Sequence, residues 1–180
     1  LGKHMTKTLA EPLQELGVMQ CDEPFRLEVA REQLPWPGSW LAVHPGSGSE
    51  RKNWAEENWK KLFAKIHEET DWNILLIGGE AEAGRIDRLA ADLPSTRVVK
   101  ADGWPLVRLA GILASVTLFA GVDSGIRHLA ELVGLSGVVI WGESNVLEWG
   151  PRDERWEIIH GLRTTPVDAM FMALMKSMKA

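Results

Sequence analysis

The sequence contains no tyrosine and one cysteine, Cys21, and each scarcity excludes a kind of chemistry. Without tyrosine, no phenol can act as a general acid. A single cysteine can form neither an internal disulfide nor a cysteine-built zinc site, and so few thiols are typical of a reducing compartment. This composition favours a cytoplasmic location.

The sequence also has no long hydrophobic run and no excess of basic residues. Its longest apolar stretch, residues 112–122, is shorter than the ~18 residues of a membrane span, so we expect no transmembrane segment. We expect no signal peptide either, because residues 1–20 lack an apolar core and a small-residue cleavage site. The balance of 20 Lys and Arg against 25 Asp and Glu argues against a nucleic-acid partner.

The carboxylate pair Asp-x-Asp, which commonly holds Mg²⁺ on a nucleotide sugar, occurs nowhere in the chain. His4, His67 and His160 are scattered, so we expect no metal site. If this protein handles a nucleotide diphosphate, cationic side chains and helix dipoles must balance the charge of the phosphates.

The remaining composition is that of a globular protein, and 180 residues suit one domain. From residue 40 onward, short apolar strands alternate with amphipathic helices. We predict strands at 40–44, 73–77, 96–99, 117–120, 137–141 and 156–159, and helices at 54–69, 80–92, 105–114, 126–133 and 166–178. Such alternation predicts an α/β fold, a Rossmann-like doubly wound parallel sheet.

Residues 1–39 precede this alternation. We predict a helix at 6–16, with Pro12 kinking or starting it, a short strand at 25–29 and a connector at 34–39. The Rossmann-like domain is therefore expected at 40–180. Its ligand would lie beyond the carboxyl ends of the strands, in loops 44–53, 78–82, 100–104, 121–125 and 142–151.

The first candidate loop contains Ser47, Gly48, Ser49 and Lys52. Small residues let a backbone approach a ligand, free N–H groups bind anions, and a lysine can neutralise a diphosphate. The loop is not a Walker A motif, because no Gly-Lys-Ser/Thr ends it. An ordinary flexible turn is the alternative. We also predict that Asn53 caps the next helix in a capping box.

The second candidate loop is Asp123-Ser124-Gly125, which closes a strand and opens a helix. Ser124, Gly125 and their N–H groups could face a phosphate or sugar, with Asp123 accepting from a hydroxyl or amine. Alternatively, Asp123 is only a helix N-cap. His128 follows one helical turn later and could face the same pocket. Because Ser124 has no evident base partner, we do not expect a serine hydrolase.

Other residues at the same edge allow two interpretations each. Glu80 could accept from ribose hydroxyls or merely favour a helix N-terminus. Trp104 could stack on a base or belong to the core. His44 could contact a ligand or be a structural histidine. The methionines of the last helix indicate packing or an interdomain surface rather than a cofactor site.

Together these segments resemble the carboxyl-terminal half of the ADP-heptose:lipopolysaccharide heptosyltransferases, glycosyltransferase family 9. The matching text runs through His44-Pro-Gly-Ser-Gly-Ser-Glu-Arg-Lys-Asn-Trp54, Ile77-Gly-Gly-Glu80, Leu113-Ala-Ser115, Phe119-Ala-Gly-Val-Asp-Ser-Gly125, His128-Leu-Ala130 and Trp149-Gly-Pro151. Order and spacing agree from about residue 40 to residue 151.

The resemblance implies one half of a GT-B enzyme that transfers heptose to the lipopolysaccharide inner core, with inversion and without metal or cofactor. It implies that Ser47, Gly48, Ser49 and Lys52 lie at the diphosphate, Glu80 at the ribose and Trp104 near the adenine. Asp123, Ser124, Gly125 and His128 would contact the phosphates and the sugar.

The resemblance further implies that 1–39 is an interdomain lead-in. The lipid acceptor and the catalytic base would belong to an amino-terminal domain that this chain lacks, so the chain alone would be inactive. It implies a cytoplasmic enzyme, and leaves open a peripheral place at the inner face of the bacterial inner membrane.

The sequence departs from the family pattern at Val122, at Arg127 and at Trp141-Gly-Glu143. Arg127 replaces a small residue and could add a phosphate contact or narrow the pocket. Two rival functions remain open. One is a nucleotide-sugar epimerase of GT-B architecture. The other is a non-catalytic interaction module that uses its methionine-rich last helix and exposed tryptophans.

Overall fold

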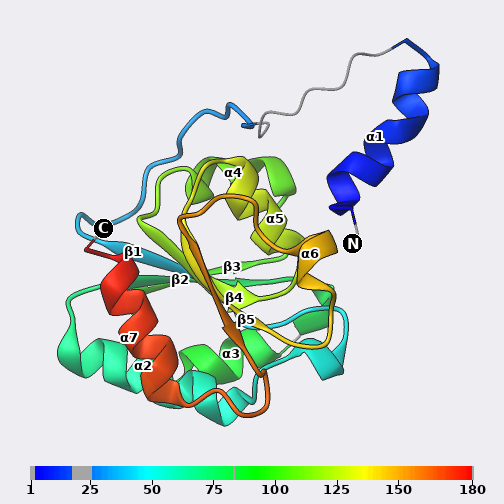
Figure 1. The fold of residues 1–180 in the computed structure, drawn as a ribbon. Coiled ribbons are helices and arrows are strands. Elements are labelled where there is room, and N and C mark those ends of the chain that lie inside the picture. The colour runs from blue at the N-terminus through cyan, green and yellow to red at the C-terminus, as the bar shows by residue number, and fades with distance from the viewer. Residues whose placement is uncertain (1–2, 18–25, 83, 180) are drawn as a thin grey trace.

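The structure, a computed structural model, describes residues 3–17, 26–82 and 84–179. Its centre is one sheet of six parallel strands in the order β3-β2-β1-β4-β5-β6 (Figure 1). The strands are β1 (Trp40–His44), β2 (Asn73–Gly78), β3 (Val98–Asp102), β4 (Leu118–Val122), β5 (Gly137–Trp141) and β6 (Trp156–His160). The chain winds outward from β1 in one direction and from β4 in the other, so the strand order switches between these two strands.

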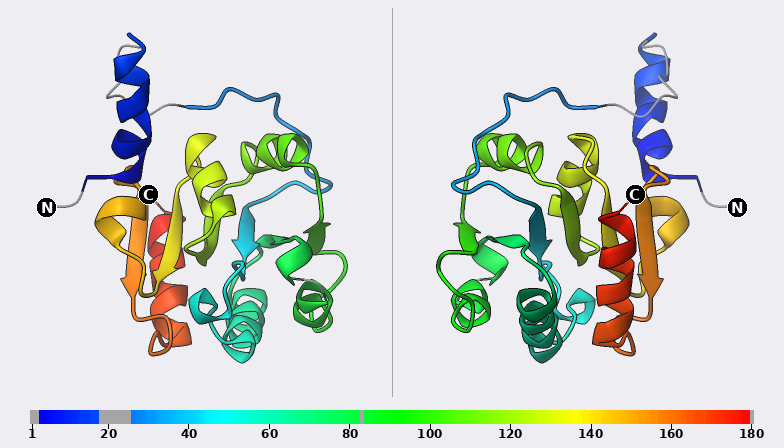
Figure 2. Two further views of the ribbon diagram at one scale, coloured as in Figure 1. Left: turned by 90° about the vertical axis from the view of Figure 1, so that its right-hand side faces the viewer. Right: turned by 90° about the vertical axis from the view of Figure 1, so that its left-hand side faces the viewer.

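Helices cover both faces of the sheet, as Figure 2 shows. One face carries α2 (Glu56–Glu69), α3 (Arg85–Ala90) and α7 (Val167–Ser177), and the other carries α4 (Leu106–Leu113) and α5 (Gly125–Leu132). In β1, Leu41 and Val43 belong to the first core while Trp40 and Ala42 belong to the second. Since alternate residues point to opposite faces, a strand buried on both must be apolar throughout. The predicted Rossmann-like doubly wound sheet is therefore confirmed.

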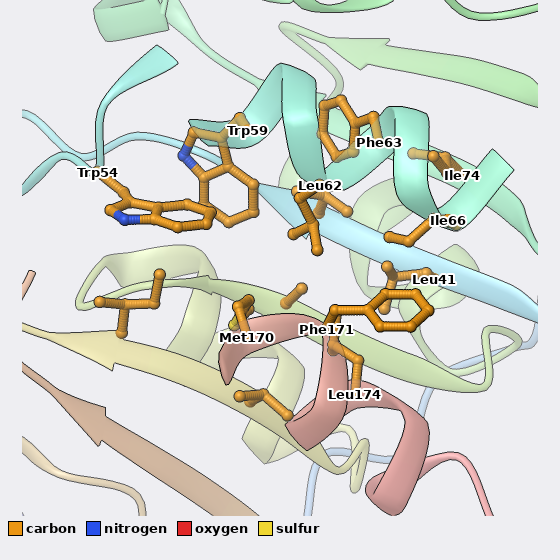
Figure 3. Close-up of a cluster of buried hydrophobic side chains, with 14 of the residues drawn as sticks. Leu41, Trp54, Trp59, Leu62, Phe63, Ile66, Ile74, Met170, Phe171 and Leu174 are labelled. Carbon is orange, nitrogen blue, oxygen red and sulfur yellow. The ribbon is translucent and has the colours of Figure 1, made fainter. Parts of the chain in front are cut away.

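The core between the sheet and helices α2 and α7 is rich in large side chains (Figure 3). Trp59 is fully buried and packs edge-on against Trp54, with ring centroids 5.0 Å apart. From α7, Met170 is fully buried in the same core, whereas Met172 is exposed. Burial of Met170 supports the packing interpretation of these methionines. Six of the nine tryptophans are buried as well, which speaks against an interface built from exposed tryptophans.

The segment before β1 agrees with the prediction in its helix but not in its strand. Helix α1 (Met5–Glu15) runs through Pro12, which excludes the alternative in which the helix begins at that proline, and it lies apart from the sheet in Figure 1. His4 Nε2 lies 3.0 Å from the carbonyl oxygen of Gly150 and links this end to the domain. The predicted strand at 25–29 is wrong for residues 26–29, which join no ladder. Residue 25 and Cys21 lie outside the described residues.

Two helix starts also differ from the prediction. Asn53 does not cap α2, because its Oδ1 accepts a hydrogen bond from the backbone N–H of Ser47 at 2.7 Å, and Ala55 takes the cap position. The helix predicted at 80–92 is split into a 3-10 turn at Glu80–Glu82 and α3, with Gly84 between them at a φ of +73°. The sequence did not predict α6 (Val146–Trp149).

Across the described ranges, no helix combines the length and the hydropathy required to traverse a lipid bilayer.

Candidate functional site

The switch in strand order places the two candidate loops next to each other. At the carboxyl ends of β1 and β4, His44 is paired in register with Gly121. The loop that follows β1 and the loop that begins at Asp123 therefore leave the sheet side by side. In a doubly wound sheet this is where ligands bind.

An ion pair joins the two loops across the switch point. Lys52 Nζ lies 2.7 Å from Asp123 Oδ2, and the Ser144 hydroxyl donates to the same oxygen at 2.7 Å. The Asp123 side chain is 8% exposed, but the Lys52 side chain is 42% exposed. Asp123 therefore holds an ammonium group at the switch point while leaving part of it open to a ligand.

Ser124, and not Asp123, is the N-cap of α5. Its Oγ accepts a hydrogen bond from the backbone N–H of Arg127 at 3.3 Å. The alternative in which Asp123 caps this helix is therefore wrong, since that carboxylate is taken by Lys52 and Ser144. Gly125, the first residue of α5, is exposed, and the positive end of the helix dipole lies beside Lys52. A lysine and a helix N-terminus together form an anion-binding arrangement.

The buried side chain of His44 lies within hydrogen-bond distance of Ser124. His44 Nδ1 lies 3.0 Å from Ser124 Oγ, and His44 Nε2 lies 3.8 Å from Glu82 Oε2. Ser124 thus has a histidine neighbour, contrary to the expectation that it lacks a base partner. The distance to Glu82 is too long for a hydrogen bond, however, and the Ser124 oxygen already serves as a helix cap. This arrangement orients Ser124 and does not reproduce a hydrolase triad.

Burial lowers the pKa of His44 from its usual 6.5 to about 4, so His44 is neutral at pH 7. An unfolded chain binds a proton at His44 as the pH falls below about 6.5, whereas the folded protein resists it. The contribution of His44 to stability is thus complete above about pH 6.5 and is lost as the pH falls toward about 4.

We therefore expect the free energy of unfolding to decline between about pH 7 and about pH 5, by up to ~1.4 kcal/mol per pH unit for each such histidine. His44→Asn keeps a polar group near Ser124 but cannot titrate, so its decline should be shallower. Urea denaturation at both pH values measures the difference. Parallel declines in the two proteins would contradict the assignment to His44.

The loop after β1, residues 44–53, is held in place by hydrogen bonds between its own polar groups. The Ser47 hydroxyl donates to the carbonyl oxygen of Ser49 at 3.1 Å, and Asn53 holds the Ser47 backbone as described above. A Cβ on Gly46 would lie 2.6 Å from Glu82 Oε1, so a larger residue there would displace the buried Glu82 side chain. A Cβ on Gly48 would meet nothing within 4 Å. The loop is thus a fixed turn with an open outer surface at Gly48.

Glu80 and Trp104 lie on the neighbouring loops, and within the described residues no hydrogen bond or ion pair joins them to the Lys52–Asp123 pair. Glu80 is exposed on its turn, while Glu82 points inward toward His44. Trp104 is half-buried after β3, with the guanidinium carbon of Arg108 3.7 Å from its ring centroid. Trp104 follows β3, which lies two strands, or roughly 10 Å, from β1 across the sheet.

Arg127 does not reach outward. Its side chain is fully buried and pairs with Glu131, with 2.6 Å between Nη1 and Oε2. The suggested phosphate contact of Arg127 is therefore wrong. Its Nη2 instead lies 2.7 Å from Nε2 of His128. Burial and the neighbouring Arg127 charge lower the pKa of His128 to about 4.

Sequence reasoning missed the supporting residue Ser144. It places two carboxylates, Glu80 and Glu82, at the end of β2 and selects Glu80, but only the tight turn after β2 decides which of them points inward. Ser144 could have been suspected as a polar residue in a loop, 142–151, at the correct edge of the sheet. Among the described residues, no three His, Cys, Asp or Glu side chains are arranged to hold a metal ion.

The sequence is similar to those of known glycosyltransferases. The profile of glycosyltransferase family 9 (heptosyltransferase) matches residues 8–169. Lipopolysaccharide heptosyltransferase 1 of Pseudomonas aeruginosa is 33% identical over 122 residues, which are 64% of this chain and 33% of that protein.

Solved structures show the same fold. A family 9 glycosyltransferase from Veillonella parvula superposes with a TM-score of 0.85 at 17% identity, over 99% of this chain and 61% of that one. The E. coli heptosyltransferase WaaC, solved with ADP, gives a TM-score of 0.71 at 20% identity, over 78% of this chain and 44% of that one. The chain thus spans less than two thirds of each of these relatives.

Proposed function

This chain belongs to glycosyltransferase family 9, and we propose that it is the part of a heptosyltransferase that binds the nucleotide sugar. The observation that carries the proposal is the Lys52–Asp123 pair, which fixes a partly exposed ammonium beside the N-terminus of α5. Cation and helix dipole together suit a diphosphate. ADP bound to WaaC supports the choice of adenine nucleotide.

The candidate residues take the following roles in this proposal. Lys52 and the backbone around Ser47, Gly48 and Ser49 meet the diphosphate. Ser124, Gly125 and His128 meet the phosphates and the sugar, and Asp123 positions Lys52. Glu80 and Trp104, on the adjacent loops after β2 and β3, contact the ribose and the adenine.

Transfer of the sugar leaves negative charge on the departing ADP. Lys52 and the N-terminus of α5 would stabilise that charge in place, a contribution worth roughly 3–4 kcal/mol in comparable preorganised sites. We propose an inverting transfer that needs no metal ion, with Lys52 and the helix N-terminus as the groups that attract the diphosphate. The catalytic base and the lipopolysaccharide acceptor site belong to a second domain in this proposal, and residues 1–39 lead into it.

Calorimetric titration of this chain with ADP tests the proposal. We expect saturable binding of ADP and much weaker binding of AMP, because AMP lacks the second phosphate that Lys52 would meet. UDP tests whether the loops after β2 and β3 distinguish the base. A folded chain that binds ADP no better than AMP would overturn the proposal.

Gly125→Ala separates binding from stability. An added Cβ would meet no atom within 4 Å, so the fold has room for it. Alanine is also favoured over glycine in a helix by up to ~1 kcal/mol. We expect unchanged or higher stability by urea denaturation, but weaker ADP binding, because the methyl group would stand between the helix N-terminus and the phosphate. Unchanged ADP affinity would remove this helix terminus from the site.

A further inference from the structure

Arg127 is a buried charged residue, and its guanidinium makes hydrogen bonds to three neighbouring residues. The guanidinium has no exposed surface. Nη1 donates to Glu131 Oε2, and Nη2 donates to the carbonyl oxygen of Trp149 and to His128 Nε2. A buried cation of this kind persists only where its partners are fixed, because losing one leaves an uncompensated charge.

The contact with His128 determines which ring nitrogen carries the proton. A guanidinium only donates hydrogen bonds, so Nε2 of His128 must accept at 2.7 Å and cannot bear a proton. The single proton of the neutral ring is then on Nδ1. His128 is therefore an N–H donor at Nδ1, and it stays uncharged because a second proton on Nε2 would face Arg127.

The other side of the imidazole is available to a ligand. No residue in the described part of the chain hydrogen-bonds to His128 Nδ1, and this nitrogen is not among the buried atoms without a partner. His128 lies one turn after Ser124 on α5, within electrostatic reach of Asp123 and Lys52. An N–H group there can donate to an oxygen of a bound ligand.

We propose that Arg127 is a positioning residue, which holds His128 as the neutral Nδ1–H tautomer so that it meets a phosphate or sugar oxygen of the nucleotide sugar as an uncharged donor. This inference rests on the proposed function, because the ligand is the same.

The tautomer is measured by NMR on protein labelled with ¹⁵N-histidine, with the His128 signals assigned from His128→Gln. In the unaltered protein we expect the proton on Nδ1, a bare Nε2, and no protonation from neutral pH to about pH 5. The charges that act on His128 are those of Arg127, Lys52 and His4, which oppose protonation, and Asp123, which favours it.

Arg127→Leu tests the cause. Glu131 retains its bonds from the backbone N–H groups of Arg152, at 2.6 Å, and Asp153, at 3.2 Å, so the local structure keeps its anchor. We expect His128 to lose its single tautomer and to titrate closer to the usual ~6.5. Arg163→Leu is the matched control, because it removes the same group from an exposed position and should leave the tautomer unchanged.

The affinity for ADP tests whether the Nδ1–H group of His128 contacts the ligand. His128→Ala and Arg127→Leu should each weaken ADP binding by roughly tenfold, whereas His128→Asn, whose amide lies near the Nδ1 position, should restore most of the affinity. A proton on Nε2 in the unaltered protein, or a tautomer unaffected by Arg127→Leu, would overturn the inference even if ADP binds. Failure of the unaltered protein to bind ADP would overturn the proposed function and leave the tautomer result standing.

Discussion

Replacing Lys52 with methionine is expected to weaken ADP binding by roughly ten- to a hundredfold. A hydrogen bond to a charged group is worth about 1.5–3 kcal/mol, and each 1.4 kcal/mol is a factor of ten in affinity. The loss exceeds that contact alone, since the nearly buried Asp123 carboxylate would keep only the Ser144 hydroxyl and would repel a phosphate. Calorimetric titration with ADP measures the change.

Two further variants make the Lys52 experiment specific. Lys61→Met removes the same charge from an exposed position on α2 and should leave the affinity for ADP unchanged. Lys52→Met combined with Asp123→Asn removes the repulsive carboxylate, so it should bind ADP better than Lys52→Met alone. If Lys61→Met and Lys52→Met weakened binding equally, Lys52 would have no place at the diphosphate.

Replacing Trp59 with alanine is expected to cost about 3–5 kcal/mol of stability, the usual loss when a buried aromatic becomes a cavity. Trp59 is fully buried between Trp54 and Phe63, with centroid distances of 5.0 Å and 6.0 Å. Since typical domains are stable by only about 5–15 kcal/mol, this variant should unfold at a much lower urea concentration. Circular dichroism follows the transition.

Trp59→Phe is the matched control. The indole nitrogen of Trp59 has no hydrogen-bond partner among the described residues, so phenylalanine removes an unsatisfied polar group while keeping most of the ring. We expect a much smaller loss of stability than for alanine. A Trp59→Ala variant as stable as the unaltered protein would mean that this core is not packed as Figure 3 shows.

Sequence patterns predicted the four central strands well because these strands are buried on both faces. The edge strand β3 is partly exposed, and it runs from Val98 to Asp102 instead of the predicted 96–99. The stretch at 137–141 is a continuous apolar run, and its predicted bounds match β5. Residues 26–29 alternate charged and apolar side chains, the pattern of a half-buried strand, but they join no strand ladder. Whether such a segment becomes a strand depends on a free sheet edge beside it, which its own residues do not specify.

Helix starts were predicted less well, because capping residues have competing partners. Asn53 has the right position for a capping box, but its side chain is taken by the backbone of Ser47, six residues earlier. Asp123 also suits a cap, yet it pairs with Lys52, 71 positions away in the chain. In both cases the local preference was outweighed by a partner outside the helix: an N–H group of the same loop for Asn53, and a lysine from another loop for Asp123.

The sequence by itself determined the α/β architecture and the edge of the sheet at which a site would form, because apolar periodicity and glycine-rich turns are local properties of the chain. Only the tertiary structure decided which side chains cooperate there. Glu82 rather than Glu80 faces His44, Ser124 rather than Asp123 caps α5, and Arg127 turns inward to His128. Such pairings follow from strand order and from packing between distant segments, and neither can be read from the spacing of residues along one stretch of chain.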